Sequence, residues 1–303
     1  MNKKILVIIG GRGIGDLIYH LPLLRSLYKT YKKKLFILSN KINKASQVYK
    51  NENFYEKIVS FDNERYSLIK TIKKIFVLKN KINKFNSDLI IVTSNTKRLV
   101  FPVLLSNAKE KKIMGIENLF LNKDNSLNQF KVSEQIIQFT NSLNLKKVHS
   151  SFFLNQKYKS YIKKKKIFFN IDSHHDQNNW DLNNFIFLIK KLIKTHKIFV
   201  NFSPNKNYLI NFFPEEIKIS SNIEFTYKKT ISEIIEIIND CNCIIGNESG
   251  PICLAAYQKK KVHALYIPLY TKPESSIINR RSKYYNVDKI SSKLIIQKIL
   301  KSI

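Results

Sequence analysis

Short apolar runs alternate with segments of helical periodicity along the whole chain. Ile5–Ile9 is a continuous apolar run, which is typical of a strand buried on both faces of a parallel sheet. In Leu17–Tyr28, which follows it, apolar residues recur at helical spacing. The same criteria predict further strands at Leu35–Leu38, Lys57–Phe61, Asp88–Thr93, Lys112–Gly115, Ile167–Ile171, Lys197–Asn201, Ile223–Phe225, Cys243–Gly246 and Val262–Tyr266. They predict further helices at Ile42–Tyr49, Tyr66–Phe85, Arg98–Leu105, Val132–Leu143, Asn183–Thr195, Asn205–Phe213, Ile231–Asn239, Pro251–Gln258 and Ser291–Ser302.

This alternation of strands and helices is interrupted once. Phe153–Lys166 is polar, rich in lysine and without clear periodicity, so we interpret it as a linker. The predicted domains are residues 1–155 and residues 166–303, each a doubly wound, Rossmann-like α/β unit. Two such domains are expected to face each other across a cleft, where the carboxyl ends of the strands of both sheets meet.

The net charge of +31 changes this picture little. Only six of the 53 basic residues are arginines, and the lysines are spread through every segment. Nucleic-acid binders usually carry arginine-bearing clusters with interleaved aromatic residues, so no specific nucleic-acid partner is expected. We interpret most lysines as solvated faces, and the alternative is attraction to an anionic membrane surface or a phosphorylated acceptor.

Location and metal content follow from what the sequence lacks. No apolar run approaches the ~20 residues of a membrane helix, and Gly10–Asp16 comes too early for a signal peptide. The three cysteines are an odd number crowded near Cys241, which fits a reducing compartment. Cys241-x-Cys243 and His174–Asp176 match no standard zinc spacing. We therefore expect a cytoplasmic protein, peripheral at most to the inner face of the cell membrane, with no metal and no cofactor.

The first candidate site is the loop Gly10–Asp16 between a predicted strand and helix. Its glycines allow a sharp turn and close approach to a ligand. A dinucleotide site would need G-x-G-x-x-G and an acid near Asn40, whereas this loop has G-x-G-x-G. Asp16 has a structural interpretation as an acid in the first turn of a helix. Its functional interpretation is a general base that accepts a proton from a hydroxyl attacking an anomeric carbon.

The second candidate site is Gly246–Pro251, between the strand that begins at Cys243 and the next helix. Pro251 suits the first turn of a helix, and Ser249 or Glu248 can cap it. The loop presents backbone donors, a hydroxyl and a carboxylate at the carboxyl edge of a sheet. This combination suits a nucleoside diphosphate with ribose or sugar hydroxyls, although a purely structural capped turn remains the alternative.

Several of these segments resemble glycosyltransferase family 9, in the expected order along both halves of the chain. Lys4–Ile8, Gly15–Ile18 and Leu21–Leu24 are similar to its opening strand, Gly-Asp pair and Leu-Pro-x-Leu helix. Gly246–Ala256 resembles its Asn-Asp-Ser-Gly-Pro loop, with Glu248 in place of the Asp. Trp180 and Ser173 stand where the family has a Lys-x-Trp motif and a small hydroxyl residue that faces the donor.

The resemblance implies a GT-B fold and an inverting, metal-independent transfer of a sugar from a nucleoside diphosphate. An ADP-sugar is the favoured donor, ADP-heptose being the best known in the family. The acceptor would be a glycan or lipid-linked acceptor, usually the growing lipopolysaccharide core at the inner face of the membrane. The catalytic residue implied is Asp16. The donor-binding residues implied are Gly13, Gly15, Ser173, Trp180, Glu248, Ser249 and Gly250.

Three further positions depart from the family pattern. Asn178 replaces the lysine of the Lys-x-Trp motif, and Cys253 replaces a histidine that follows the Ser-Gly-Pro loop. The family's later Gly-Pro-Thr turn stands here as Ile267-Pro268-Leu269, without its glycine. Arg12 or Lys272 are candidates for the missing phosphate charge. One alternative is therefore a catalytically degenerate nucleotide-sugar-binding protein. The others are a nicotinamide-dependent oxidoreductase, suggested by the glycine loop, and a nucleic-acid or membrane-surface binder, suggested by charge.

Overall fold

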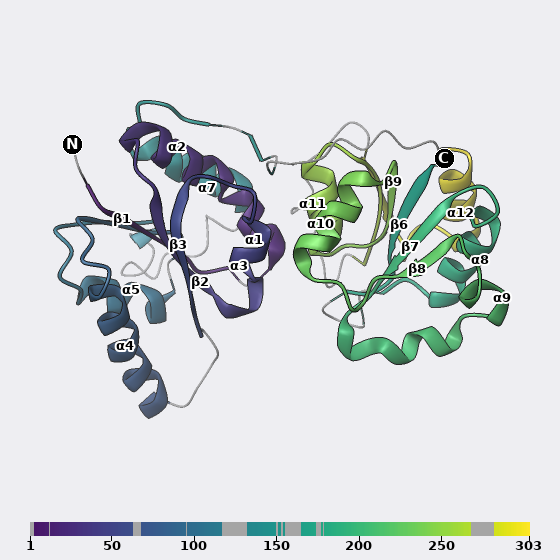
Figure 1. Ribbon diagram of the computed structural model, residues 1–303, viewed down its shortest axis with the longest axis horizontal. Helices are drawn as coiled ribbons and strands as arrows, with labels where there is room; N and C mark the ends of the chain where they lie inside the picture. Colours follow the sequence, from purple (N-terminus) through teal and green to yellow (C-terminus); the bar gives the residue numbers. More distant parts are fainter. Residues whose placement is uncertain are drawn as a thin grey trace. The chain divides into compact units, whose positions relative to one another are not determined.

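The computed structural model folds as two compact units, Met1–Asn155 and Gln156–Ile303 (Figure 1). Residues described in it are 3–11, 13–62, 68–94, 96–116, 132–149, 151–152, 154, 165–173, 177, 179–267 and 282–303. Residues 155–164 of the predicted linker lie outside these ranges, whereas Lys166 already begins a strand.

The first unit contains a five-stranded parallel sheet in the order β3-β2-β1-β4-β5. Its strands are β1 (Ile5–Ile9), β2 (Leu35–Asn40), β3 (Tyr55–Phe61), β4 (Leu89–Val92) and β5 (Glu110–Ile113). All five residues of the central strand β1 are buried, as its continuous apolar run predicts. One face is covered by α1 (Ile14–Tyr19), α2 (Leu21–Tyr31) and α7 (Val132–Ser142), and the other by α4 (Leu68–Asn83) and α5 (Lys97–Leu104). The short helices η1 (Lys41–Asn43) and α3 (Ala45–Val48) follow β2.

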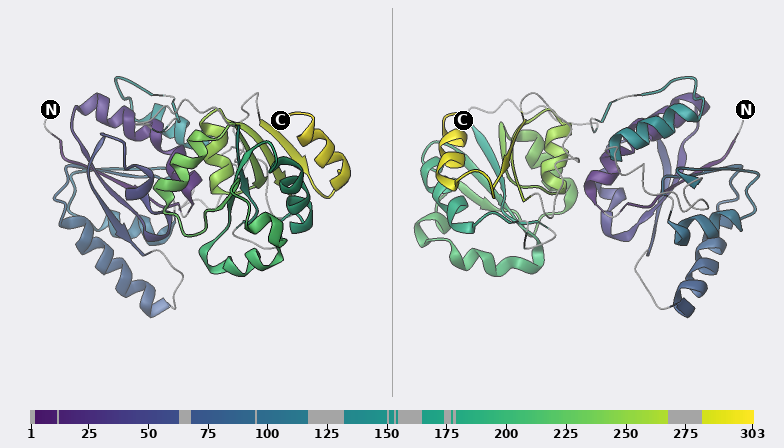
Figure 2. Two further views of the ribbon diagram at one scale, coloured as in Figure 1. Left: turned by 45° about the vertical axis from the view of Figure 1, so that its right-hand side comes forward. Right: turned by 180° about the vertical axis from the view of Figure 1, so that it is seen from behind.

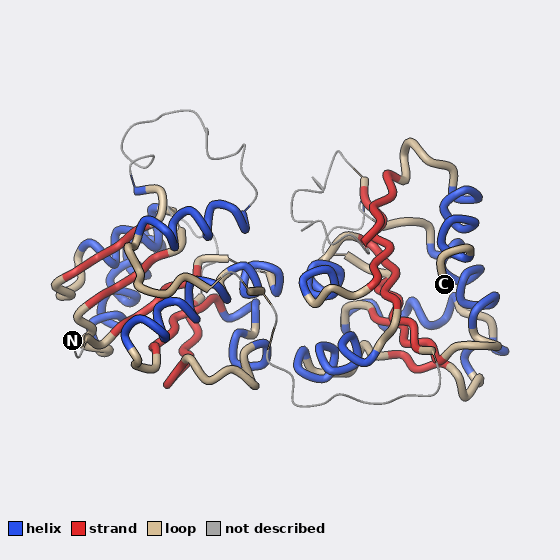
Figure 3. The backbone as a smooth tube through the Cα atoms, turned by 90° about the horizontal axis from the view of Figure 1, so that it is seen from above, coloured by secondary structure: helices blue, strands red, loops and turns tan. Residues whose placement is uncertain are grey.

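The second unit contains a six-stranded parallel sheet in the order β11-β10-β9-β6-β7-β8. Its strands are β6 (Lys166–Asn170), β7 (Lys197–Asn201), β8 (Ile223–Phe225), β9 (Cys243–Asn247), β10 (Lys261–Tyr266) and β11 (Ser282–Asn286). Figure 3 shows helices on both sides of these strands. They are α8 (Leu182–Leu192) and α12 (Ser292–Leu300) on one face, and α10 (Ile231–Asp240) and α11 (Gly250–Tyr257) on the other. The segment after β7 forms η4 (Pro204–Phe212) and α9 (Glu215–Lys218). The predicted α/β class, with one parallel sheet in each half of the chain, is confirmed.

The structure differs from the local predictions at several places. The helix expected over Leu17–Tyr28 is broken at His20, because Pro22 has no N–H and its ring would clash with the carbonyl of Ile18 in a continuous helix. The helix expected at Asn205–Phe213 is a 3-10 helix over Pro204–Phe212, whose Leu209 and Ile210 are only partly buried against the core. Strand β11 was not predicted, because its sequence Ser-Lys-Tyr-Tyr-Asn has neither an apolar run nor an alternating pattern.

Candidate functional site

The loop that leaves β1 is arranged around the carboxylate of Asp16. Gly13 is the extended N-cap of α1, and its N–H donates to Asp16 Oδ2 at 2.7 Å. A Cβ on Gly11 would lie 2.4 Å from both Cβ and Cγ of Asp16, so the loop can pass the carboxylate only with glycine there. Gly15 precedes Asp16 in the first turn of α1. The structure therefore brings Gly13, Gly15 and Asp16 together, whereas Arg12 lies outside the described residues.

A buried histidine supports the backbone of Asp16 from behind. His20 Nδ1 is hydrogen-bonded to the carbonyl oxygen of Asp16, and its Nε2 lies 2.6 Å from Thr93 Oγ1. A carbonyl oxygen can only accept, so Nδ1 carries the proton and Nε2 accepts from the threonine. Burial lowers the pKa of His20, which keeps the ring neutral in this arrangement. The sequence analysis did not single out His20, although it stands beside Pro22 at the helix break.

The carboxylate of Asp16 retains capacity for a ligand. Its Oδ2 accepts from Gly13, whereas its Oδ1 has no hydrogen-bond donor among the described residues. The residue is partly exposed, unlike the neighbouring Leu17, which is buried. The group is thus a fixed, solvent-accessible proton acceptor at the carboxyl end of a central strand.

The loop that leaves β9 is built by buried polar side chains. Asn247 is fully buried, its Oδ1 accepts from the Trp180 N–H at 2.8 Å, and its Nδ2 donates to the Ile171 carbonyl at 2.9 Å. A Cβ on Gly246 would lie 2.2 Å from the carbonyl oxygen of Asn170, so β9 can approach β6 here only with glycine. These contacts hold the loop against the carboxyl end of β6.

The predicted donor residues Glu248, Ser249 and Gly250 follow at the start of α11. Glu248 is buried, and its N–H donates to the carbonyl of Leu265 at 2.9 Å. Ser249 is the extended N-cap, and its Oγ accepts from Asn170 Nδ2 at 2.9 Å. Because the first N–H groups of a helix have no acceptor within the helix, this helix start offers donors to an anion.

A buried ion pair lies at the same sheet edge and was not predicted. The Asp172 side chain, 2% exposed, forms an ion pair with Lys206, which is itself 14% exposed. Asp172 Oδ2 also accepts from the hydroxyl and N–H of Ser203, at 2.6 and 3.1 Å. Lys206 Nζ additionally donates to the carbonyl of Ser173 at 3.4 Å. The pair therefore places a cation directly beside Ser173, one of the predicted donor residues.

Hydrogen bonds connect this cation and Ser173 to the loop that carries Ser249. Asn170 Nδ2 donates both to the carbonyl of Asp172, at 2.5 Å, and to the hydroxyl of Ser249. Strands β6 and β7 are parallel neighbours, so the residues that follow them end at one edge. The available signal was an Asp directly after one predicted strand and a Lys shortly after the next.

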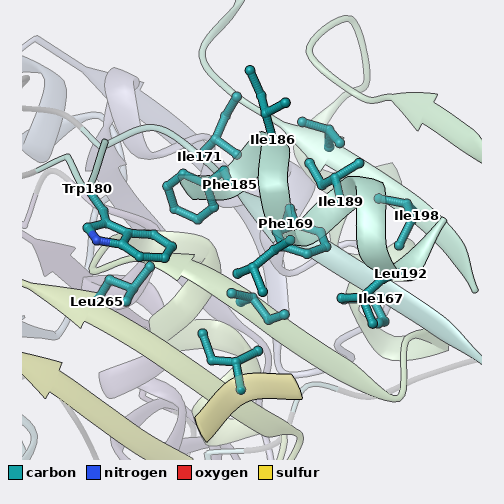
Figure 4. Packing of buried hydrophobic residues seen from close by; sticks show 14 of the residues in the cluster. Ile167, Phe169, Ile171, Trp180, Phe185, Ile186, Ile189, Leu192, Ile198 and Leu265 are labelled. Atoms are coloured by element: carbon teal, nitrogen blue, oxygen red, sulfur yellow. The ribbon is translucent and has the colours of Figure 1, made fainter. Parts of the chain in front are cut away.

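Trp180 is positioned differently from the other predicted donor residues. Its side chain is 5% exposed and packs edge-on against Phe185, with ring centroids 5.1 Å apart (Figure 4). Its Nε1 donates to Ser292 Oγ at 3.1 Å. The indole therefore belongs to the hydrophobic core, and the backbone N–H of Trp180 is what contacts the β9–α11 loop, through Asn247. Asn178 and Lys272 lie outside the described residues.

The cysteines and acids of the described part form no evident metal centre. Burial raises the pKa of Cys241 and of Cys243, so both thiols stay protonated. Within the ranges that the structure describes, His, Cys, Asp and Glu side chains nowhere form a group of three or more that could hold a metal ion. The residues His174–Asp176 lie outside those ranges. Among the described helices, none has both the length and the apolar character needed to cross a membrane.

Sequence comparison finds one matching family. The family model of glycosyltransferase family 9 (heptosyltransferase) matches residues 118–287, which is more than half of the chain and includes the β9–α11 loop. Comparison with curated proteins gives no match.

Solved structures show the same fold over nearly the whole chain. The Escherichia coli ADP-heptose lipopolysaccharide heptosyltransferase II has a TM-score of 0.76 at 14% identity, covering 99% of this chain and 98% of that chain. The family 9 glycosyl transferase from Veillonella parvula has a TM-score of 0.73 at 16% identity, covering 100% and 91%. The E. coli heptosyltransferase WaaC with ADP has a TM-score of 0.74 at 15% identity, covering 99% and 100%. The predicted GT-B fold is thereby confirmed.

Proposed function

The chain belongs to glycosyltransferase family 9, and on that premise we propose that it transfers a sugar from a nucleoside diphosphate donor to a hydroxyl group of a glycan or lipid-linked acceptor. The observation that carries the proposal is the carboxylate of Asp16, fixed through one oxygen by the Gly13 N–H and partly exposed. A carboxylate held in this way suits proton abstraction from an attacking hydroxyl.

In the proposed reaction, Asp16 accepts the proton of the acceptor hydroxyl as its oxygen attacks the anomeric carbon of the donor sugar. The new carbon–oxygen bond forms while the bond from that carbon to the diphosphate breaks. A single displacement of this kind inverts the anomeric configuration. The nucleoside diphosphate leaves with the bonding electron pair, and its developing charge must be stabilised.

That stabilisation is assigned to the second unit. Its candidates are the N–H groups at the start of α11, the hydroxyls of Ser173 and Ser249, and the ammonium group of Lys206. Lys206 is a cation at the sheet edge, which supports a metal-independent mechanism although Asn178 replaces the lysine of the family motif. Glu248 and Gly250 complete the proposed donor loop. Trp180 would act by fixing Asn247 and so the loop, rather than by indole contact.

The substrates proposed follow the family. The E. coli heptosyltransferase WaaC is described with ADP and with ADP-2-deoxy-2-fluoro heptose, which supports an ADP-sugar, and specifically an ADP-heptose, as the donor. The acceptor proposed is a lipopolysaccharide-type core, which would locate the protein at the cytoplasmic face of the membrane, in peripheral contact with anionic lipids.

The test is a donor panel on the full chain. Thermal stability and sugar transfer are measured with ADP-, UDP- and GDP-sugars and with NAD, using a deacylated lipopolysaccharide core as acceptor. A donor at ~100 times its dissociation constant adds about 2.7 kcal/mol to the stability of the folded state. We expect a selective shift with an ADP-sugar, together with transfer. Selective binding without transfer would instead indicate a non-catalytic nucleotide-sugar-binding protein, and a response to NAD alone would contradict the proposal.

A further inference from the structure

The outer side of the α4 and α5 layer is unusually apolar. Thirteen large hydrophobic side chains are exposed in the described part of the chain, and six of them lie on these two helices and the residue after α5. We call this group the α4–α5 face; its members, with exposed fractions, are Ile72 48%, Phe76 53%, Val77 64%, Phe101 40%, Leu104 38% and Leu105 50%. Such a concentration on one layer marks an interaction surface rather than scattered exposure.

The core of the first unit does not account for this face. The inward side of the two helices already packs on the sheet, through Ile82, Leu99 and Val103 among others. A helix at the surface of a soluble unit normally carries polar residues on its outward side. Helix α4 instead has apolar side chains on both sides, and Figures 1 and 2 show it extending past α5, away from the sheet.

The charged residues of the two helices are all basic, and Lys74 of α4 pairs with Asp62, which follows β3. The sequence of α4 contains five lysines and no acid, and that of α5 contains a lysine, an arginine and no acid. Lys73, Lys84, Lys97 and Lys109 are exposed, and none forms an ion pair with a carboxylate of the described residues. Exposed apolar side chains together with exposed lysines on the same two helices match an anionic lipid surface, where the acyl boundary takes apolar groups and the phosphates attract lysine.

We propose that the α4–α5 face docks the first unit on an anionic lipid bilayer, with Ile72, Phe76 and Val77 entering the headgroup region and the lysines contacting lipid phosphates. The proposal deepens the peripheral membrane contact named above, and it stands on this face alone, because vesicle binding requires no sugar transfer. A second copy of the chain fits less well, since a symmetric contact would bring lysines against lysines. Nucleic acid would leave the apolar side chains without a partner.

The second unit offers a matched comparison surface. Tyr208, Phe212 and Ile219 are 52%, 62% and 80% exposed, which is as much as the members of the α4–α5 face. Their neighbours include Glu215 and Glu216, whose side chains are 79% and 70% exposed. Apolar exposure is therefore similar on the two surfaces, and the local charge differs. Anionic lipid should discriminate between them.

The test is co-sedimentation of the full chain with vesicles of phosphatidylcholine alone, or with about one quarter phosphatidylglycerol. We expect binding to the mixed vesicles, weaker binding to the neutral ones, and loss of the difference at high salt. The double variant Phe76→Asn, Val77→Asn should reduce partitioning about tenfold or more. The variant Lys73→Gln, Lys97→Gln should reduce partitioning on mixed vesicles alone, also by about tenfold. The control Phe212→Asn, Ile219→Asn should bind like the wild type.

A second measurement reports insertion directly. The single tryptophan of the chain, Trp180, is buried in the second unit, so its emission forms a constant background. The variant Phe76→Trp should add an emission that shifts to the blue on mixed vesicles and not on neutral ones. Wild-type binding equal on both vesicle types, or an added emission that does not shift in Phe76→Trp, would overturn the proposal. So would a change of oligomeric state in Phe76→Asn, Val77→Asn without lipid, because it would identify a second copy as the occupant.

Discussion

The loop after β1 in the first unit and the loop after β9 in the second share one local design. Each leaves a central, fully buried parallel strand, passes a glycine and enters a helix. Their polar side chains behave differently. Asp16 has one oxygen bound and remains partly exposed, whereas Asn247 is fully buried with both ends of its amide bonded. The first loop presents a partly exposed carboxylate with one oxygen available, and the second uses side chains to hold its backbone.

In the proposed transfer reaction, the two loops have different roles. A base must meet its proton with a free lone pair, so its fixation has to leave one oxygen available. Hydrogen-bond donors stabilise an anion best when they are held rigidly, so the backbone that carries them should be fully fixed. The two loops can therefore be disrupted separately, and each disruption has its own expected signature.

The largest expected effect comes from Gly246→Ala. The added Cβ would lie 2.2 Å from the backbone oxygen of Asn170, so β6 and β9 must separate. We expect a loss of about 3 kcal/mol or more in the free energy of unfolding, measured by urea denaturation. Gly13→Ala is the matched control, since its nearest contact is Asp16 Oδ2 at 3.5 Å, and it should cost less than about 1 kcal/mol. Equal losses would show that the close approach of the strands is not what requires glycine.

The substitution Lys206→Met removes the cation that lies beside Ser173 at the sheet edge of the second unit. It leaves the buried Asp172 with the two donors of Ser203 and with Asn179 Nδ2 at 3.5 Å, so we expect a destabilisation of about 3 kcal/mol. The affinity for the donor should fall as well. Lys218→Met is the control, because its pair with the exposed Glu215 should contribute less than about 1 kcal/mol. Unchanged donor affinity in a folded Lys206→Met protein would remove Lys206 from the proposed site.

Gly11→Ala disrupts the first loop instead. Its Cβ would overlap Asp16, so the carboxylate must turn or shift. We expect turnover to fall about 10- to 100-fold, since small displacements of a reacting group are costly. Donor affinity, measured by titration calorimetry, should change little, because the second loop is intact and Gly13 and Gly15, the first-loop residues implied for donor binding, are not substituted. A parallel loss of donor affinity would mean that the division of work between the loops is wrong.

The smallest expected effect concerns a buried histidine of the second unit. His263 contacts Tyr285 and Ser302, and burial lowers its pKa to about 4. Its ordinary pKa is 6.5, so between those values the unfolded state binds the extra proton, and stability falls as pH decreases. At pH 5.5 the free energy of unfolding is lower by about 1 kcal/mol for this reason. In urea denaturation, the free energy of unfolding of His263→Gln should depend less on pH between 6.5 and 4 than that of the wild type. An unchanged slope would show that another group causes the pH dependence.

The sequence predicted most of the fold, because buried parallel strands have a strong local signal. The apolar runs of β1 and β9 identify central strands without any knowledge of their neighbours. Edge strands lack that signal, as β11 shows with its polar and aromatic sequence. The break at His20 had a signal in Pro22, which was outweighed by apolar periodicity that continues through the break.

The candidate site was predicted in part, for a related reason. Strand-to-helix loops containing glycine can be found in the sequence, so Asp16 and Ser249 were identified. The pair of Asp172 and Lys206 depends on β6 and β7 being neighbours, which only the sheet order reveals. The position of Trp180 in a motif likewise does not indicate that its ring points into the core.

The central claim is that Asp16 is the base and that donor binding does not depend on it. Its most direct test is Asp16→Asn, with turnover and donor affinity measured on the same preparation. Asparagine retains an oxygen for the Gly13 N–H, so the loop should keep its shape. We predict that turnover falls about 10²- to 10⁴-fold with an unchanged dissociation constant for the donor. Turnover close to that of the wild type would contradict the account.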